Sequence, residues 1–275
     1  MPPARRRLDA ELVRRKIARS REQAVDWIKA GRVEVGGFVA KKPATIVEPD
    51  VSIKVAKADD DDWASRGAHK LLGALEAFEP QGLTVEGKRA LDAGASTGGF
   101  TDVLLRRGAC EVVAVDVGYG QLVWRLQNDD RVKILDRTNI RHLTPELMDG
   151  PADLMVGDLS FISLELVLPA IAECMSDGAD LLPMVKPQFE VGKGRLGSGG
   201  VVRSPELREE VTLDVARKAL ELGLSCKAAT ASPLPGPSGN VEYFLWLVRD
   251  GGASAPGDDE LARMINRAVE EGPVN

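Results

Sequence analysis

The stretch LDAGASTGGFTD, residues 91–102, decides the fold of this chain together with VVAVD at 112–116. An apolar strand ends at Asp92, a glycine-rich turn follows, a helix opens within the turn, and the next strand ends at Asp116. In a nucleoside-binding βαβ unit, glycines let the backbone approach the ligand and the second acid binds ribose hydroxyls. The sequence therefore predicts a nucleoside cofactor at this turn, with a ligand-free tight turn as the plainer alternative.

The spacing within the turn narrows the choice of cofactor. GASTGG lacks the G-x-G-x-x-G spacing of dinucleotide-binding enzymes. The turn also follows Asp92, an acid that would repel a pyrophosphate but suits a cationic amino-acid ligand. S-adenosylmethionine is therefore favoured over NAD. An NAD-dependent oxidoreductase stays as an alternative that a cofactor-binding titration separates.

Strand and helix patterns alternate from residue 65 onward. Strands are expected at 88–94, 111–116, 131–135, 151–158, 179–189, 224–231 and 240–248, and helices at 65–78, 100–107, 121–127, 164–175 and 205–223, followed by a terminal helix within 251–272. Such alternation is typical of an α/β protein with a mostly parallel sheet and helices on both faces. A Rossmann-like fold is the prediction.

The first 58 residues have a different pattern and are predicted to form a small α+β domain. Two short amphipathic helices are expected at 8–17 and 20–31, the second with Ser20 as N-cap and Gln23 at the capping-box position. A strand, a Gly-Gly turn and a strand follow at 32–40, and a last strand at 51–57. The predicted domains are 1–58 and 65–275, joined by a linker at 59–64.

The net charge of −6 hides an asymmetry between the two ends of the chain. Residues 1–57 hold 14 Lys and Arg against 7 Asp and Glu, and the remainder carries a net charge of −13. A basic module on an acidic body is typical of polyanion binding through one end, although a solvated charged face would look the same.

Composition excludes several other classes of protein. No apolar run is long enough to span a membrane, and MPPARRRLDAEL lacks the apolar core of a signal peptide. Cys110, Cys174 and Cys226 are far apart and are expected to be reduced core residues, and two histidines make a metal site unexpected. We expect a cytoplasmic monomer with neither a metal nor a membrane partner.

The basic module resembles an S-four-type RNA-binding domain over residues 6 to about 57. The matching residues are Arg7-Leu8-Asp9, Ala18-Arg19-Ser20-Arg21 with Ala24, the stretch 31–37 and Lys42-Pro43. The resemblance implies that the helix pair presents Arg19, Arg21 and their neighbours to RNA phosphates, which guanidinium groups match well. The candidate RNA contacts are Arg5, Arg7, Arg19, Arg21, Lys42 and Arg66.

Four charged residues are expected at the carboxyl edge of the large sheet, where α/β proteins bind ligands. They are Lys70, Asp158, Lys186 and Glu242. Lys186 ends an apolar strand, which an ordinary surface lysine rarely does, although it could reach solvent or pair with a single acid. A ribose hydroxyl is a weak acid and a poor nucleophile, so a lysine at its oxygen with a second cation nearby would help it attack a methyl sulfonium.

The same four residues lie in motifs that resemble the FtsJ-related ribose 2′-O-methyltransferases, and most closely the TlyA branch. The matching segments are SRGAHKL (65–71), LDAGASTGGFTD (91–102), DVGYGQL (116–122), DLSFISL (158–164), VKPQFEVGKG (185–194) and SPLPGPSGNVEYFLWL (232–247). The resemblance implies a catalytic tetrad of Lys70, Asp158, Lys186 and Glu242, an antiparallel final strand, and methylation of cytidine 2′-hydroxyls in ribosomal RNA. The basic lead at 5–7 and the terminal helix favour action on both the small and the large subunit.

The resemblance also supplies cofactor contacts, namely Asp92, Gly94, Ser96, Gly98, Phe100, Asp116, Thr138 and Asn139. Phe100 and Phe161 could equally be core residues. The linker departs from the family, because close relatives have Arg-Ala-Trp-Val where this chain has Asp61-Asp62-Trp63-Ala64. If the linker couples RNA docking to cofactor binding, the coupling is either altered here or carried by Trp63. The alternative functions are a catalytically inactive assembly factor and a membrane-active haemolysin.

Overall fold

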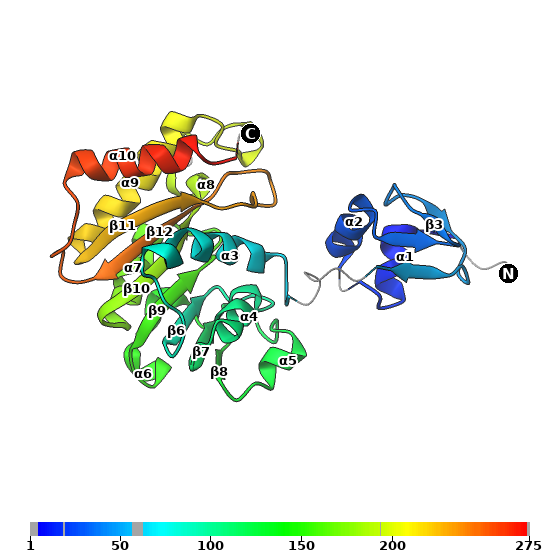
Figure 1. Cartoon of the computed structure of the whole chain (residues 1–275), viewed down its shortest axis with the longest axis horizontal. Coiled ribbons are helices and arrows are strands. Elements are labelled where there is room, and N and C mark those ends of the chain that lie inside the picture. Colours follow the sequence, from blue (N-terminus) through cyan, green and yellow to red (C-terminus); the bar gives the residue numbers. More distant parts are fainter. Residues whose placement is uncertain (1–4, 19, 57–62, 193, 274–275) are drawn as a thin grey trace. The chain divides into compact units, whose positions relative to one another are not determined.

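The computed structural model describes residues 5–18, 20–56, 63–192 and 194–273. The chain divides into two compact units, residues 1–62 and residues 63–275 (Figure 1). The smaller unit combines two helices with short antiparallel strands, and the larger is a helix–sheet–helix α/β fold. The predicted limits of the linker, 59–64, stay a prediction because most of that segment lies outside the described residues.

The first unit packs its two helices against short antiparallel strands. Its elements are β1 (Arg6–Arg7), α1 (Leu8–Arg14), α2 (Arg21–Lys29), β2 (Val33–Val35), β3 (Phe38–Val39), β4 (Ile46–Val47) and β5 (Ile53–Val55). The hydroxyl of Ser20 accepts a hydrogen bond from the backbone N–H of Gln23, so the predicted N-cap is confirmed. Gly36 and Gly37 adopt φ of 57° and 87°, which the tight turn between β2 and β3 requires.

The second unit is built on a sheet of seven strands. Its elements are α3 (Gly67–Phe78), β6 (Arg89–Ala93), α4 (Gly99–Arg106), β7 (Glu111–Val115), α5 (Trp124–Gln127), β8 (Val132–Leu135), α6 (Pro145–Met148), β9 (Ala152–Gly157), α7 (Leu168–Glu173), β10 (Met175–Val185), α8 (Pro187–Glu190), α9 (Pro205–Glu221), β11 (Leu224–Ala231), β12 (Tyr243–Arg249) and α10 (Asp258–Glu270). The strand order is β11-β12-β10-β9-β6-β7-β8. The strands from β10 to β8 are parallel, and β12 runs antiparallel to both β10 and β11, which confirms the predicted mostly parallel sheet and its antiparallel last strand.

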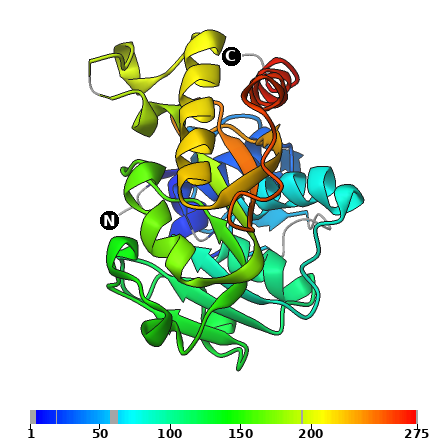
Figure 2. The same cartoon turned by 90° about the vertical axis from the view of Figure 1, so that its left-hand side faces the viewer.

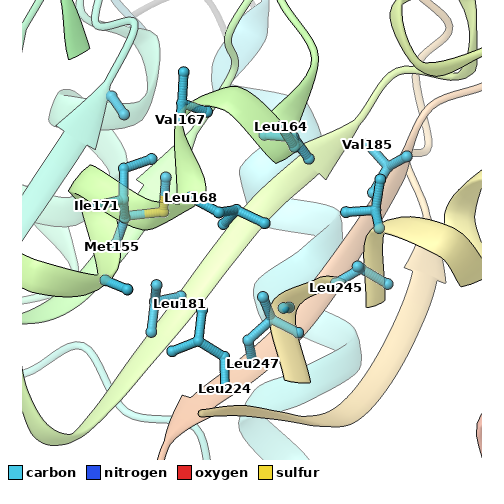
Figure 3. Packing of buried hydrophobic residues seen from close by; sticks show 14 of the residues in the cluster. Met155, Leu164, Val167, Leu168, Ile171, Leu181, Val185, Leu224, Leu245 and Leu247 are labelled. Atoms are coloured by element: carbon cyan, nitrogen blue, oxygen red, sulfur yellow. The ribbon is translucent and has the colours of Figure 1, made fainter. Parts of the chain in front are cut away.

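Alternating side chains of the strands fill two cores, one on each face of the sheet. Leu91, Met155 and Leu181 belong to the core beneath α7, α9 and α10, whereas their sequence neighbours belong to the core beneath α3 and α4. Figure 3 shows the first of these cores, and Figure 2 shows the helices on either side of the sheet. Burial on both faces explains why the strands are continuous apolar runs.

Some predicted elements differ from the structure for local reasons. The helix expected at 121–127 is one turn, α5, because Val123 before it is extended. The helix expected at 164–175 is broken into a 3-10 turn at Leu164–Leu166 and α7, which begins just before Pro169. Cys110 is exposed rather than a core residue, whereas Cys174 and Cys226 are buried.

Candidate active site

The carboxyl ends of β6 and β9 meet where the strand order reverses. The strands β6, β7 and β8 progress toward one edge of the sheet, whereas β9 and β10 lie on the other side of β6. The backbone N–H of Asp158 donates to the carbonyl of Ala93 over 3.1 Å, so the two strand ends stay joined beyond the ladder. Open α/β sheets bind their ligands at such a switch point.

The four charged residues expected at this edge form one alternating chain of cations and anions. Lys186 Nζ lies 2.5 Å from Asp158 Oδ1, and Lys70 Nζ lies 3.5 Å from Asp158 Oδ2 and 2.6 Å from Glu242 Oε2. Both lysines are nearly buried, with side chains 7% and 6% exposed, while Asp158 is 24% exposed. Buried charges are stable only when paired, and here each lysine has a carboxylate partner. The structure thus brings the predicted tetrad together.

Each residue of the tetrad lies on or next to a different helix or strand. Lys70 lies on α3, Asp158 follows β9, Lys186 follows β10 at the N-terminus of α8, and Glu242 precedes β12. A glycine makes room for Glu242, since a Cβ at Gly236 would lie 2.5 Å from Glu242 Oε1. This oxygen is buried and accepts no hydrogen bond within the described part of the chain.

A fifth polar side chain, not predicted from the sequence, reaches the tetrad. Lys186 Nζ donates a hydrogen bond of 2.8 Å to Ser160 Oγ. Its contact with Asp158 Oδ1 is an ion pair whose alignment falls short of a hydrogen bond. The signal in the sequence was the position of Ser160, two residues beyond Asp158 in the loop that leaves β9.

The glycine-rich turn after β6 has the shape of a ligand cradle. Gly94 and Gly98 adopt φ of 87° and 96°, and Ser96 adopts 47°, a conformation that residues with a side chain rarely take. A Cβ at Gly94 would lie 3.1 Å from the carbonyl oxygen of Asp158, so the turn passes close to the tetrad. Phe100, the first-turn residue of α4, is buried against Phe244 and is a core residue.

Asp116 is held in place by the same turn. Its Oδ2 accepts from the N–H of Ser96 over 2.8 Å, and its Oδ1 accepts from the N–H of Gly118 over 2.7 Å. Beside it lie two exposed apolar side chains, Val117 and Tyr119, which were not among the predicted site residues. The backbone N–H of Thr138 donates to the carbonyl of Asp116, so the segment 138–139 lies near this acid, and its contact with the cofactor stays a prediction.

Asp92 is fully buried behind the turn. Its Oδ2 accepts from the Thr101 hydroxyl over 2.6 Å, and its Oδ1 has no hydrogen-bond partner among the described residues. Burial raises the pKa of this carboxyl to about 7, the hydroxyl and N–H of Thr101 lower it in part, and the nearby carboxylates Asp158 and Asp116 raise it further. The prediction that Asp92 contacts the cofactor stays a prediction, because its side chain is inaccessible to solvent in this structure.

The residues that lead into α3 are fastened to α4. Asp102 Oδ2 accepts from the N–H of Ala64 over 2.8 Å, and both carboxyl oxygens accept from Arg125. Burial would raise the pKa of Asp102, but the bonds from Arg125 and Ala64 outweigh it and lower the pKa. Arg106 lies over the ring of Trp63, 4.2 Å from its centroid. The acidic residues Asp61 and Asp62 lie outside the described residues.

The predicted RNA contacts of the first unit are basic side chains in an intramolecular network. Arg7 and Arg21 donate to the buried Asp9, and Arg7 foremost holds the pKa of that carboxyl well below its usual range. Arg5 Nε pairs with Glu48 over 2.6 Å. The side chains of Arg5, Arg7 and Arg21 remain 70%, 49% and 62% exposed, and Lys42 is exposed as well. Arg66 is exposed on the second unit, and Arg19 lies outside the described residues.

The described residues lack two features, a side-chain group for a metal ion and a membrane-spanning helix. No group of three or more His, Cys, Asp or Glu side chains there could hold a metal ion. No helix in those parts of the chain is both long and apolar enough to span a membrane.

Comparisons with known proteins agree with this geometry. The FtsJ-like methyltransferase family profile matches residues 63–249, and the S4 domain profile matches residues 6–53. The chain is 59% identical over 98% of its length to the 16S/23S rRNA (cytidine-2'-O)-methyltransferase TlyA of Mycobacterium tuberculosis, of which it covers 99%. It is 37% identical over 88% of its length to Hemolysin A of Brachyspira hyodysenteriae, of which it covers 99%. A solved structure of a candidate hemolysin from Streptococcus thermophilus has a TM-score of 0.76 at 36% identity, covering 98% of this chain and 97% of that one.

Proposed function

Because the chain belongs to the FtsJ-like methyltransferase family, in its TlyA branch, we propose that it methylates cytidine 2′-hydroxyls of ribosomal RNA with S-adenosylmethionine. The observation that carries the proposal is the alternating chain of Lys186, Asp158, Lys70 and Glu242 beside the glycine cradle. The N-terminal S4 domain supports RNA as the substrate. Bound S-adenosylmethionine supplies a methyl group on a positively charged sulfur.

The cradle fits such a cofactor. The positive φ at Gly94 and Gly98 lets the backbone turn without side chains in the way, and Asp116 is fixed where a ribose acceptor is needed. Ser96 and the segment 138–139 lie around this acid, and Val117 offers an exposed apolar surface beside it. Asp92 lies buried behind the turn, and the proposal includes it as a cofactor contact through the oxygen that has no partner among the described residues.

The tetrad would act on the ribose hydroxyl. Lys186 would contact the 2′-oxygen and accept the hydroxyl proton as the oxygen attacks. The oxygen then forms the bond to the methyl carbon, and the electron pair of the broken carbon–sulfur bond stays on sulfur. Lys70 stabilises the negative charge that develops on the oxygen, Asp158 orients both lysines, and Glu242 holds Lys70. Alignment of the oxygen, carbon and sulfur in one line supplies much of the rate.

The basic unit would deliver the RNA to this site. Arg5, Arg7 and Arg21 are exposed enough to reach phosphates while their intramolecular partners keep them in place, and Lys42 is exposed as well. The proposal extends to Arg19 and Arg66. Phosphate contacts position a protein without reading sequence, so the choice of cytidine falls to the second unit. We further propose that the protein acts in the cytoplasm as a monomer on both ribosomal subunits.

The test is methyl transfer from labelled S-adenosylmethionine to small and large subunits that lack ribose methylation, followed by mapping of the modified riboses. Label is expected in cytidine 2′-oxygens of both subunits, and Lys186→Ala is expected to lose at least about a hundredfold in rate. Lys218→Ala, which removes an exposed lysine of α9, is the matched control. Absence of label in ribose, or full activity of Lys186→Ala, would reject the proposal, and label in one subunit alone would restrict it to that subunit.

Two other functions remain testable in the same preparation. A catalytically inactive assembly factor would bind subunits without transferring label. A membrane-active role has the names of two similar proteins in its favour. Release of dye from protein-free liposomes by the purified chain would support it.

A further inference from the structure

The contact between Lys186 and Ser160 is part of the site but not of the tetrad. It joins two loops, because Ser160 follows β9 and Lys186 follows β10. Lys186 is 5% exposed, whereas Ser160 is exposed. The serine hydroxyl thus lies at the solvent end of a nearly buried lysine.

Counting the donors of Lys186 shows what this contact does. A protonated lysine has three N–H donors, and a neutral lysine has two and one lone pair. In the structure the amine has two polar neighbours, Asp158 Oδ1 at 2.5 Å and Ser160 Oγ at 2.8 Å. In either protonation state the nitrogen has three positions besides its carbon, so two that face these neighbours leave one for a third direction.

The two neighbours hold the amine differently. The contact with Asp158 is electrostatic and lacks the alignment of a hydrogen bond, whereas the contact with Ser160 has it. Coulomb attraction varies little with angle, so a carboxylate alone would let the amine rotate. The direction of the third position therefore depends on the serine hydroxyl.

We propose that Ser160 is a positioning residue for methyl transfer. Its hydroxyl orients the Lys186 amine so that the third position on the nitrogen points at the ribose hydroxyl. The inference rests on the proposed function. Ser160 acts through Lys186, and the bound cofactor needs no contact with it.

The loop that carries Ser160 is built to hold it still. Phe161, the next residue, adopts a φ of 63°, an unfavourable conformation for a bulky side chain that persists only where its surroundings impose it. Glu190 accepts from Ser163 Oγ over 2.6 Å and from the N–H of Leu164 over 3.0 Å. The turn after β10 is thereby tied to the loop after β9 through two donors, and the bond from the N–H of Leu164 remains when Ser163 is replaced by alanine.

The experiment compares three serine variants of the full-length chain. Ser160→Ala removes the acceptor, Ser160→Thr keeps a hydroxyl, and Ser163→Ala removes a hydroxyl of the same loop that does not touch the tetrad. Each is assayed by single-turnover methyl transfer to unmethylated subunits at saturating S-adenosylmethionine, together with calorimetric binding of S-adenosylmethionine.

We expect Ser160→Ala to lower the single-turnover rate about tenfold, the effect of one lost hydrogen bond to a charged group. Its affinity for S-adenosylmethionine and its KM for subunits should stay within about twofold of the wild type. Ser160→Thr should recover most of the rate, and Ser163→Ala should transfer methyl groups at close to the wild-type rate.

Three results would overturn the inference. The first is an unchanged single-turnover rate in Ser160→Ala. The second is an equal loss of rate in Ser163→Ala, which would assign the effect to loop packing. The third is a change in the KM for subunits without a change in the single-turnover rate. A wild-type chain that transfers no methyl group rejects the proposed function instead, so the two failures are distinguishable.

Discussion

The buried carboxyl of Asp92 makes the stability of this protein depend on pH in an unusual direction. Most carboxyl groups that a fold perturbs have a lowered pKa. Full burial instead raises the pKa of Asp92 to about 7 from the ordinary aspartate value of 3.8. The hydroxyl of Thr101 satisfies one oxygen, while the other lacks a partner within the described residues. The carboxylates of Asp158 and Asp116 both raise its pKa further.

The magnitude follows from linkage between folding and protonation. Between about pH 4 and pH 7 the folded protein keeps a proton on Asp92 that the unfolded chain has lost, so this carboxyl makes the free energy of unfolding fall as pH rises. Each pKa unit corresponds to 1.36 kcal/mol, and the shift of Asp92 therefore amounts to about 4 kcal/mol. About 2 kcal/mol of this is lost between pH 5 and pH 7, and the dependence flattens at higher pH.

Asp92→Asn removes the titration while keeping an oxygen that can accept from Thr101. The assay is urea unfolding of the full-length wild type and variant at pH 5, 6, 7 and 8, followed by tryptophan fluorescence. The variant is expected to gain about 2 kcal/mol in free energy of unfolding relative to the wild type between pH 5 and pH 7, because the other titrating groups cancel in the comparison.

Asp250→Asn provides the matched control. Burial of Asp250 is outweighed by hydrogen bonds from Ser225, Ser254 and the N–H of Gly252, which lower the pKa of its carboxyl to about 2. Asp250 therefore stays charged in both states over this range, and its variant should differ from the wild type by a constant amount. Parallel curves for Asp92→Asn and the wild type would refute the reasoning.

Three further predictions concern the site and its supports. Gly236→Ala should lower the single-turnover methyl transfer rate at least about tenfold without loss of folding, because its Cβ would lie 2.5 Å from Glu242 Oε1 and push that carboxylate from its lysine; an unchanged rate would show that Glu242 can move freely. Asp102→Ala should lower the free energy of unfolding by about 2–3 kcal/mol in urea denaturation, since it removes the acceptor of Ala64 and Arg125, and a loss below about 0.5 kcal/mol would contradict this. Deletion of residues 1–60 should abolish methyl transfer to subunits but leave calorimetric binding of S-adenosylmethionine intact; retained transfer would show that the acidic body binds RNA unaided.

The sequence predicted the large sheet and the composition of its carboxyl edge well. Buried parallel strands are continuous apolar runs, so their ends are easy to locate, and the residues that follow them must lie on one edge. Asp116, Asp158 and Lys186 were predicted to lie there for that reason, and the structure places them there. Lys70 and Glu242 were predicted at the same edge, but their part in a catalytic tetrad came from the family resemblance, because a lysine on a helix and an acid before a strand are common on protein surfaces.

What the sequence did not predict depends on contacts between segments far apart in the chain. The bond from Lys186 to Ser160 needs the relative position of two loops that no local pattern encodes. The accessibility of Asp92 depends on how the glycine turn and α4 close over the end of β6, whereas the residue type suggested only that an acid was present. Cys110 was expected in the core with the other two cysteines, but it lies in the short connection before β7 and is exposed.

The glycine turn and the tetrad are connected through the backbone of Asp158. The carbonyl of Ala93, at the end of β6, accepts from the N–H of Asp158, and the turn at Gly94 passes so close that a Cβ there would lie 3.1 Å from the Asp158 carbonyl oxygen. Any movement of the glycine turn on ligand binding must therefore move the backbone of the residue that orients both lysines. Since Lys186 takes its direction from Asp158 and from Ser160 two residues later, that movement reaches the amine along a single short loop. We therefore expect ligand binding at the glycine turn and the orientation of Lys186 to be coupled through the junction of β6 and β9.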